Sequence, residues 1–406
     1  MREQIDQGLR DRGLEAVVVC GGPSVSWETA YLVGPVKVTW GYVFKRVGQE
    51  PVFMARSIER HEAAKARCPL ITFDKVGISE IGRADLPRAE REAAIVEQIL
   101  EFNDCRGKVA LYGSGSISTY GECLRILRER QPDTFPHAQG RRSLFEEATL
   151  TKDEDEIERI ADVGLRVEDV IRTTFNYLTT LIGEGDTVFD FEGEAITVGD
   201  IKDMIVREAG RRKIDVPIDV TFAQGPLSAI PNNRGESREA LRTGTPVVFD
   251  IAAQARRGYH FELTRTFCIG ETTPRFEEVF GLVNRALEIS LENLRPGRSA
   301  LAVNAAVSDF FEQEGFPTLR QGKTERGFVH FLGHGIGLDL YEHPKIGPVE
   351  EELELQPGMV LAIEPGLYLP EESFGVRLGE VAVVEKSGPP RVLSRVDKKP
   401  LVRLSR

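Results

Sequence analysis

The stretch HFLGHGIGLDLYEHP (330–344) carries three of the chain's six histidines around a run of glycines. Glycine lets the backbone approach a bound ligand closely, because it has no side chain in the way. A single histidine is more often a hydrogen-bonded core residue than a ligand. Three of them around one glycine-rich bend favour a functional site, so His330 and His334 are the first candidates.

Acidic residues interrupt apolar strands elsewhere in the chain. In GMVLAIEPGLYLP (358–370), Glu364 ends a predicted strand and is held by a Pro-Gly turn. In TPVVFDIAA (245–253), Asp250 lies within an apolar run, where an unpaired carboxylate is costly to bury. It must therefore be exposed, paired with a base or bound to a cation.

The strand GYHFELTRTF (258–267) places Glu262, Thr264 and Thr266 on one face, because side chains alternate along a strand. If this strand pairs with the one before it, Asp250 and Glu262 project into one pocket. A later predicted strand, GVRLGEVAVVE (375–385), carries Arg377. A structural ion pair and recognition of a substrate carboxylate are both open for this arginine.

Carboxylates and imidazoles together suit zinc, manganese, cobalt or iron. The sequence contains no Walker loop, GxSxG elbow, GxGxxG fingerprint or HExxH motif that would favour another chemistry. We therefore expect hydrolysis, with a divalent metal ion as the cofactor.

The pattern of apolar and polar residues changes near residue 150. Residues 1–150 alternate short apolar runs with amphipathic segments, which predicts an α/β domain. The polar stretch LTKDEDEIE (150–158) precedes a long amphipathic helix to about residue 178, and acidic residues suit a first helical turn. We place a domain boundary near residue 150, although a charged bend within one domain would give the same pattern. Residues 151–406 interleave long helices with strand pairs, an α+β pattern.

Composition limits the partners and the compartment. The 406 residues include 52 basic and 64 acidic side chains, a net charge of −12. Such a chain repels phosphate backbones and anionic lipids, so we expect neither a nucleic-acid nor a membrane partner. Five cysteines without CxxC spacing, a charged amino terminus and the lack of a long apolar segment predict a cytoplasmic protein.

In chain order, these motifs resemble those of the pita-bread hydrolase superfamily, which includes Xaa-Pro dipeptidases, aminopeptidase P, methionine aminopeptidase and creatinase. SWETAYLVG (26–34) resembles the amino-terminal domain and LTKDEDEIERI (150–160) the start of the catalytic domain. The resemblance implies an α+β fold, with a creatinase/prolidase-type α/β domain over residues 1–150 and a pita-bread catalytic domain over residues 151–406. It also implies a homodimer that acts on a small peptide or another small C–N substrate.

In the metallopeptidases of this superfamily, two aspartates, one histidine and two glutamates hold two metal ions. By resemblance, three of these ligands match Asp250, His334 and Glu364. Glu262 falls at the second aspartate, with a spacing one residue longer than in the family. The fifth ligand falls at Gly379, so the resemblance implies a degraded site with one metal ion or none, unless a bulge turns Glu380 inward.

The resemblance also implies roles for the residues around the metal. Glu364 would act as general base, His330 would stabilise the oxyanion, and His343 or Tyr341 would donate a proton to the leaving nitrogen. Arg377 would bind a substrate carboxylate.

The leading hypothesis is therefore an Xaa-Pro dipeptidase-like or aminopeptidase-like metallohydrolase. The alternative is a metal-independent C–N hydrolase of the creatinase or ectoine hydrolase type, in which His260, His330 and Glu364 do acid/base or covalent work and His260 also binds the substrate. A third hypothesis is a catalytically silent module that binds peptides.

Overall fold

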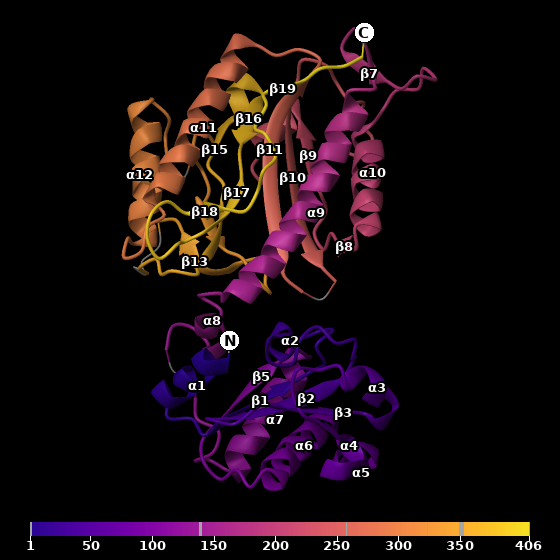
Figure 1. Cartoon of the computed structure of the whole chain (residues 1–406), viewed down its shortest axis with the longest axis vertical. Coiled ribbons are helices and arrows are strands. Elements are labelled where there is room, and N and C mark those ends of the chain that lie inside the picture. The colour runs from indigo at the N-terminus through magenta and orange to yellow at the C-terminus, as the bar shows by residue number, and fades with distance from the viewer. Residues whose placement is uncertain (1, 138–139, 257, 323, 349–352, 406) are drawn as a thin grey trace. The chain divides into compact units, whose positions relative to one another are not determined.

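The computed structural model describes residues 2–137, 140–256, 258–322, 324–348 and 353–405 (Figure 1). The chain divides into two compact units, Met1–Thr149 and Leu150–Arg406. Each unit encloses a hydrophobic core of its own.

The amino-terminal unit is built on a five-stranded sheet in the order β4-β3-β2-β1-β5. Its strands are β1 (Ala16–Cys20), β2 (Gly41–Arg46), β3 (Val52–Ala55), β4 (Leu70–Thr72) and β5 (Val109–Gly113). Strand β2 runs antiparallel to both neighbours, whereas β5 is parallel to β1 and β4 is parallel to β3. Parallel neighbours need crossover connections. Helices provide most of these, as the alternation of apolar runs and amphipathic segments predicted.

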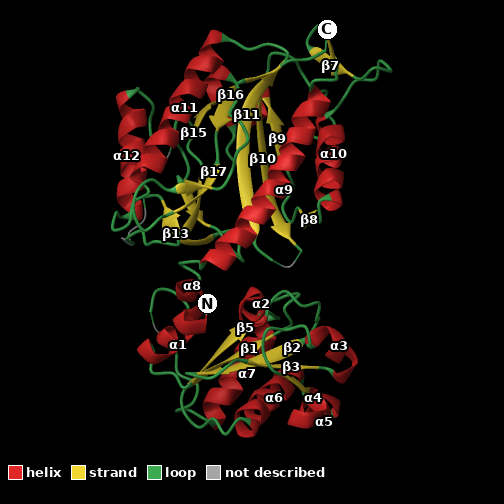
Figure 2. Ribbon diagram, in the orientation of Figure 1, coloured by secondary structure: helices red, strands yellow, loops and turns green. Residues whose placement is uncertain are grey.

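The helices of this unit are α1 (Arg2–Asp11), α2 (Trp27–Val33), α3 (Arg60–Ala63), α4 (Phe73–Val76), α5 (Ile78–Arg83), α6 (Arg88–Phe102), α7 (Ile117–Arg130) and α8 (Leu144–Ala148). The two longest, α6 and α7, pack on one face of the sheet and bury Val96, Ile99 and Leu127 in its core (Figure 2).

The carboxy-terminal unit contains four long helices, α9 (Glu154–Leu178), α10 (Val198–Arg211), α11 (Pro274–Asn293) and α12 (Ala300–Gln313). Helix α9 begins with a capping box, in which the Asp153 side chain accepts from the Glu156 amide and the Glu156 side chain accepts from the Asp153 amide. It lies close against the central hairpin, because Gly164 faces the Phe261 ring where a Cβ atom would lie 2.6 Å from a ring carbon.

The strands of this unit are β6 (Ile182–Glu184), β7 (Thr187–Phe189), β8 (Ile214–Asp215), β9 (Thr221–Gln224), β10 (Pro246–Ala255), β11 (His260–Ile269), β12 (Gly333–Gly335), β13 (Glu342–Ile346), β14 (Val360–Ile363), β15 (Gly366–Leu369), β16 (Phe374–Arg377), β17 (Glu380–Val383), β18 (Arg391–Val392) and β19 (Leu401–Val402). One sheet has the order β19-β11-β10-β8, with β9 also paired to β10, and another has the order β13-β12-β14-β17-β18. Figures 1 and 2 show α9 and α10 on one side of the strands, with α11 and α12 on the other.

The prediction of a single strand over residues 375–385 was wrong. The segment is divided at Leu378 and Gly379: β16 pairs with β15, and β17 belongs to the sheet of β14. This division places Arg377 and Glu380 in different surroundings.

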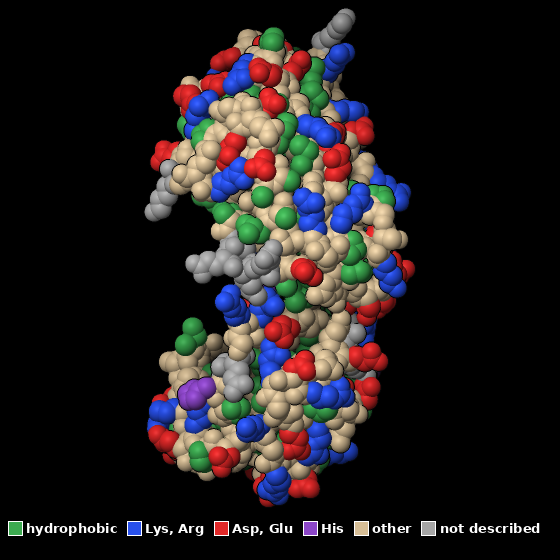
Figure 3. Space-filling view, turned by 90° about the vertical axis from the view of Figure 1, so that its left-hand side faces the viewer, with side chains coloured by type: hydrophobic (Ala, Val, Ile, Leu, Met, Phe, Trp, Pro, Cys, Tyr) green, Lys and Arg blue, Asp and Glu red, His purple; other side chains and the backbone are tan. Residues whose placement is uncertain are grey.

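The surface carries mixed charge. On the face shown in Figure 3, acidic and basic side chains are interspersed over each unit. In the described part of the chain, no helix is both long and apolar enough to cross a membrane.

Candidate metal centre

The hairpin of β10 and β11 supplies the first two acids. Its antiparallel register places Asp250 opposite Thr264 and Ala252 opposite Glu262. Residues directly opposite each other point to the same face of a sheet, so both carboxylates emerge on one face, as expected if the two strands paired. Both side chains are buried.

His334 reaches the same place from β12, the central strand between β13 and β14. Its two glycine neighbours make this close pairing possible. A Cβ atom at Gly333 would lie 2.0 Å from the Ala362 carbonyl oxygen, and one at Gly335 would lie 2.1 Å from the His343 carbonyl oxygen. No larger residue fits at either position without moving the backbone, which explains the glycine run.

Glu262, His334 and Glu364 converge, and each offers one ligand atom within 4.8 Å of the other two. The Nε2 atom of His334 lies 3.3 Å from a Glu262 oxygen and 4.0 Å from a Glu364 oxygen. The ring Nδ1 of His334 lies 2.9 Å from the Gly335 carbonyl oxygen. When Nδ1 donates its proton to this carbonyl, Nε2 carries a lone pair that faces the two carboxylates. This is the arrangement of a metal-binding histidine.

The donor atoms of this cluster are unsatisfied. Within the described part of the chain, His334 Nε2 and Glu262 Oε2 are buried and form no hydrogen bond. Buried polar atoms normally have partners, because burial without one costs free energy. Two carboxylates and one imidazole are ligands of zinc, manganese, cobalt and iron. The residues present therefore fit a divalent cation, and their unsatisfied atoms are the ones that would bind it.

The charges of the cluster act on one another. Burial and the nearby Glu364 carboxylate raise the pKa of Glu262. Burial also acts to raise the pKa of Glu364, but Arg377 and His334 lower it overall. Burial acts to lower the pKa of His334, but the Glu262 and Glu364 carboxylates raise it overall. The site thus concentrates negative charge that a cation would neutralise.

Asp250 lies beside this cluster but has a different partner. Its Oδ2 atom is 2.6 Å from Nη2 of Arg377, and both side chains are buried. Of the two roles open for Arg377, the structure therefore shows the ion pair, while a second bond runs from its Nη1 to the Pro231 carbonyl oxygen at 3.3 Å. The second carboxylate oxygen of Asp250 has no hydrogen-bond partner among the described residues.

Gly379 and Glu380 are the two positions considered for a fifth metal ligand. A Cβ atom at Gly379 would be 3.0 Å from Oγ1 of Thr264, a residue that itself contacts the cluster. The Glu380 carboxylate instead binds Arg265 and Lys398, each at 2.9 Å, and is not part of the cluster. The bulge that would turn Glu380 inward is therefore not formed, since the chain passes to another sheet at this point.

Sequence reasoning missed two residues that contact the predicted ones. The hydroxyl of Thr264 donates to Glu364 Oε1 at 2.9 Å and fixes that carboxylate. The hydroxyl of Tyr368, which is buried, lies 3.0 Å from Nε2 of His330. The sequence pattern could have identified Thr264 as a site residue, because it lies on the same strand face as Glu262. For Tyr368 the sequence offers no indication beyond its place in the apolar strand after Glu364.

His330 is held on both ring nitrogens, because its Nδ1 lies 2.7 Å from the Phe331 carbonyl oxygen. Burial and the nearby Arg377 lower the pKa of His330 to about 4, so the ring is neutral near pH 7.

Tyr341 lies against the metal-facing histidine, with its ring centroid 4.8 Å from that of His334. Its side chain is 50% exposed, so it borders the open side of the cluster.

The other two predicted histidines lie outside the cluster of acids. His260 is buried, and its Nδ1 lies 3.2 Å from the Gly337 carbonyl oxygen, so it holds the glycine-rich loop. The contact engages only Nδ1, and the role of His260 toward a substrate stays a prediction. His343 is half-buried on β13, and among the described residues its ring has no hydrogen-bond or ion-pair partner.

A buried ion pair fixes the loop that follows His334. Nζ of Lys152 lies 2.6 Å from a Glu342 oxygen, and the two side chains are 2% and 5% exposed. The other oxygen of Glu342 accepts from the Asp339 amide at 3.1 Å. A Cβ atom at Gly337 would lie 2.4 Å from this carboxylate, so the loop closes tightly around it.

Residues 160–386 match metallopeptidase family M24, and the match covers more than half of the chain. The chain belongs to this family. The family expected from the motifs is thereby confirmed.

Curated relatives match part of the chain. Probable dipeptidase PepE of Mycobacterium tuberculosis (strain ATCC 25618 / H37Rv) is 33% identical over 239 residues, which are 59% of this chain and 57% of that protein. Xaa-Pro dipeptidase of Pyrococcus furiosus is 30% identical over 174 residues, which are 43% of this chain and 47% of that protein. The chain thus spans about half the length of these relatives.

Solved structures match nearly the whole chain. X-Pro aminopeptidase from Thermotoga maritima has a TM-score of 0.75 at 20% identity and covers 98% of this chain and 100% of its own. Prolidase from Pyrococcus furiosus has a TM-score of 0.73 at 20% identity, with coverages of 97% and 100%. These likenesses confirm the predicted α+β fold.

The Lys152–Glu342 pair makes a prediction about stability. Lys152→Met leaves the buried Glu342 carboxylate without its cation and should lower the free energy of unfolding by about 3–5 kcal/mol. Arg285→Met is the matched control, because Arg285 forms exposed ion pairs with Glu288 and Glu292 and should cost less than about 1 kcal/mol. Urea unfolding followed by circular dichroism measures both, and equal losses would contradict the prediction.

Proposed function

We propose that this protein is a metal-dependent peptidase of the Xaa-Pro dipeptidase or aminopeptidase type, which hydrolyses an amide bond in a small peptide. The observation that carries the proposal is the convergence of Glu262, His334 and Glu364, in which His334 Nε2 and Glu262 Oε2 are buried and have no hydrogen-bond partner among the described residues. Family membership and the dipeptidases among the relatives support the same reaction class.

We infer that one divalent ion, manganese, cobalt, zinc or iron, is held by these three residues. When bound, such an ion polarises a carbonyl group and makes water more acidic. Asp250 contributes less directly, because its carboxylate is already paired with Arg377. Arg377 then acts as a positioning residue for Asp250 rather than as a ligand of the substrate carboxylate.

The residues around the cluster supply the proton transfers. Thr264 holds one oxygen of Glu364, which leaves the other directed at the cluster as a general base. Tyr368 donates its hydroxyl proton to Nε2 of the neutral His330 ring, and this pair could stabilise an oxyanion only if the hydroxyl turned its proton from His330 to the substrate. Tyr341, which is half-exposed beside His334, is placed to donate to the leaving nitrogen. His343 remains an alternative donor, since its ring is otherwise unengaged in the described part of the chain.

A metal-independent C–N hydrolase is the second candidate, and one observation favours it. The position of the fifth family ligand is Gly379, and the neighbouring Glu380 carboxylate binds Arg265. The Nδ1 contact of His260 with the Gly337 carbonyl oxygen fixes the ring and leaves its Nε2 atom for the acid/base role that this candidate requires. A silent peptide-binding module would show tight peptide binding without turnover.

Two further proposals concern the cellular compartment and the oligomeric state. The five free cysteines fit a reducing compartment, and we therefore propose a cytoplasmic location. A homodimer, expected from the resemblance, stays a prediction.

Hydrolysis of Ala-Pro should require a metal ion. We expect the purified protein to cleave this dipeptide with added manganese, cobalt or zinc and to lose the activity with a chelator. Glu364→Gln should lower kcat by about 10²–10⁴-fold, because the general base is removed, whereas Glu371→Gln, a change at a half-exposed acid, should not. An absence of metal stimulation would reject this proposal, and chelator-resistant hydrolysis of creatine-like substrates would select the second candidate.

Gly379→Glu tests the missing ligand directly. Because residue 379 lies beside Thr264, a carboxylate there should reach the cluster and raise the metal content from about one ion per chain toward two. Gly379→Ala is the control, since it adds the same Cβ contact without a carboxylate. Elemental analysis of the purified variants measures the ratio, and equal metal content in both variants would contradict the assignment of residue 379 as the position of the missing ligand.

A further inference from the structure

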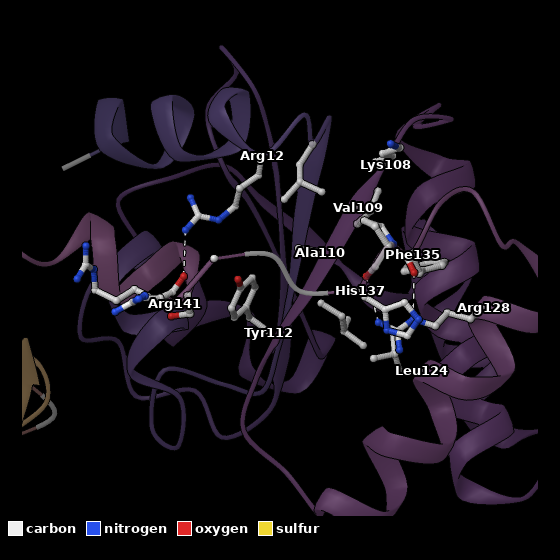
Figure 4. Close-up of a pocket in the computed structure, with 16 residues that line it drawn as sticks. Arg12, Lys108, Val109, Ala110, Tyr112, Leu124, Arg128, Phe135, His137 and Arg141 are labelled. Atoms are coloured by element: carbon white, nitrogen blue, oxygen red, sulfur yellow. Dashed lines mark hydrogen bonds between the residues drawn. The ribbon is translucent and has the colours of Figure 1, made fainter. Parts of the chain in front are cut away.

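A cavity of about 360 Å³ lies within the amino-terminal unit, and none of the lining residues that the structure describes belongs to the metal centre (Figure 4). Its basic lining residues are Arg12, Lys108, Arg128, Arg141 and Arg142, together with His137. None of its described lining residues is Asp or Glu. A cavity whose charged lining residues are all basic stands out in a chain whose net charge is −12.

The fold builds this cavity along an edge of the sheet. Strand β5 is the last strand in the sheet order, and its residues 109–112 line the cavity. Apolar side chains, among them Leu14, Leu124 and Phe135, form much of the remaining wall. Small-molecule sites typically combine an apolar lining with a few convergent polar groups, in volumes of roughly 300–1,000 Å³.

The basic groups lie at two ends of the cavity. Figure 4 shows Arg12 and Arg141 on one side of Tyr112, and Lys108, Arg128 and His137 on the other. Ala110 lies between them, and Leu124 lies beside His137 and Arg128. This arrangement suits an elongated ligand with a charged group at each end.

Two of the arginines are held in place by backbone carbonyls. Arg128 donates to the carbonyl oxygens of Phe135 and Pro136, each at 3.0 Å. Arg12 donates to the carbonyl oxygens of Gly8 and Arg142, both at 3.1 Å, and also pairs with Glu147. A carbonyl orients a guanidinium but does not neutralise its charge, so Arg128 keeps a fixed positive charge at one end.

Lys108 and Arg141 add adaptable charge. Both side chains are exposed, and within the described part of the chain neither has an ion-pair partner. Arginine is suited to phosphate and carboxylate groups, because its planar fork donates two hydrogen bonds to such oxyanions.

We propose that this cavity binds a small organic anion with a phosphate or carboxylate group at each end. The site lies in a different unit from the metal centre, and the proposal stands independently of the peptidase reaction.

Calorimetric titration of the full chain tests the site, with fructose 1,6-bisphosphate and glutarate as probes and fructose as the neutral control. We expect one bisphosphate or one dicarboxylate per chain, with an affinity that falls as salt is added, because exposed charges are screened. Arg141→Glu and Lys108→Glu should each weaken binding by about tenfold or more, since each removes a charge-assisted contact.

Lys75→Glu is the matched control, because Lys75 is an exposed base of the same unit that does not line the cavity. It should bind the probes as the unchanged protein does. The two test positions are exposed, so thermal unfolding should confirm that both variants are folded. Failure of both probes to bind, or equal binding by the test variants and the control, would overturn the proposal.

Discussion

The repulsion between the buried carboxylates of Glu262 and Glu364 is the constraint around which the catalytic unit is arranged. One oxygen of each carboxylate lies within 4.8 Å of an oxygen of the other, and the proximity of Glu364 raises the pKa of Glu262. Two like charges in a poorly solvated place are costly unless an opposite charge or a proton joins them. Arg377 supplies part of the compensation, because it lowers the pKa of Glu364, and a divalent cation would supply the rest.

Two arginines define how far this negative charge extends. Arg377 neutralises Asp250 on one side, and Arg265 neutralises Glu380 on the other. Both pairs are buried, and one oxygen of each acid, Asp250 Oδ1 and Glu380 Oε2, has no hydrogen-bond partner among the described residues. The proposal of one ion therefore rests on the three-residue cluster and on the absence of a carboxylate at Gly379.

Strand periodicity made much of this site predictable. The two-residue period of β11 fixes Glu262 and Thr264 on one face whatever the surroundings, and pairing with β10 brings Asp250 to the same face. The family motifs predicted His334 and Glu364 for a related reason. They occur where glycines or a Pro-Gly turn restrict the backbone, and such restrictions are visible in a sequence.

Partners distant in the chain were not predictable in the same way. Arg377 meets Asp250 across 127 positions, and no local pattern distinguishes this pairing from a substrate contact. The contact of His260 with the Gly337 carbonyl oxygen, 77 positions away, has no local sequence signal either. The break at Gly379 was hidden because both halves of the segment are apolar and alternate like one strand. Tertiary packing decided each of these features.

The central claim is that three side chains from separate strands grip one cation. Anomalous diffraction from crystals of the full chain grown with manganese tests it most directly. The account predicts one anomalous peak per chain, within bonding distance of Glu262, His334 and Glu364. A peak between Asp250 and Gly379 instead, two peaks of equal height, or no peak beside His334 would contradict it.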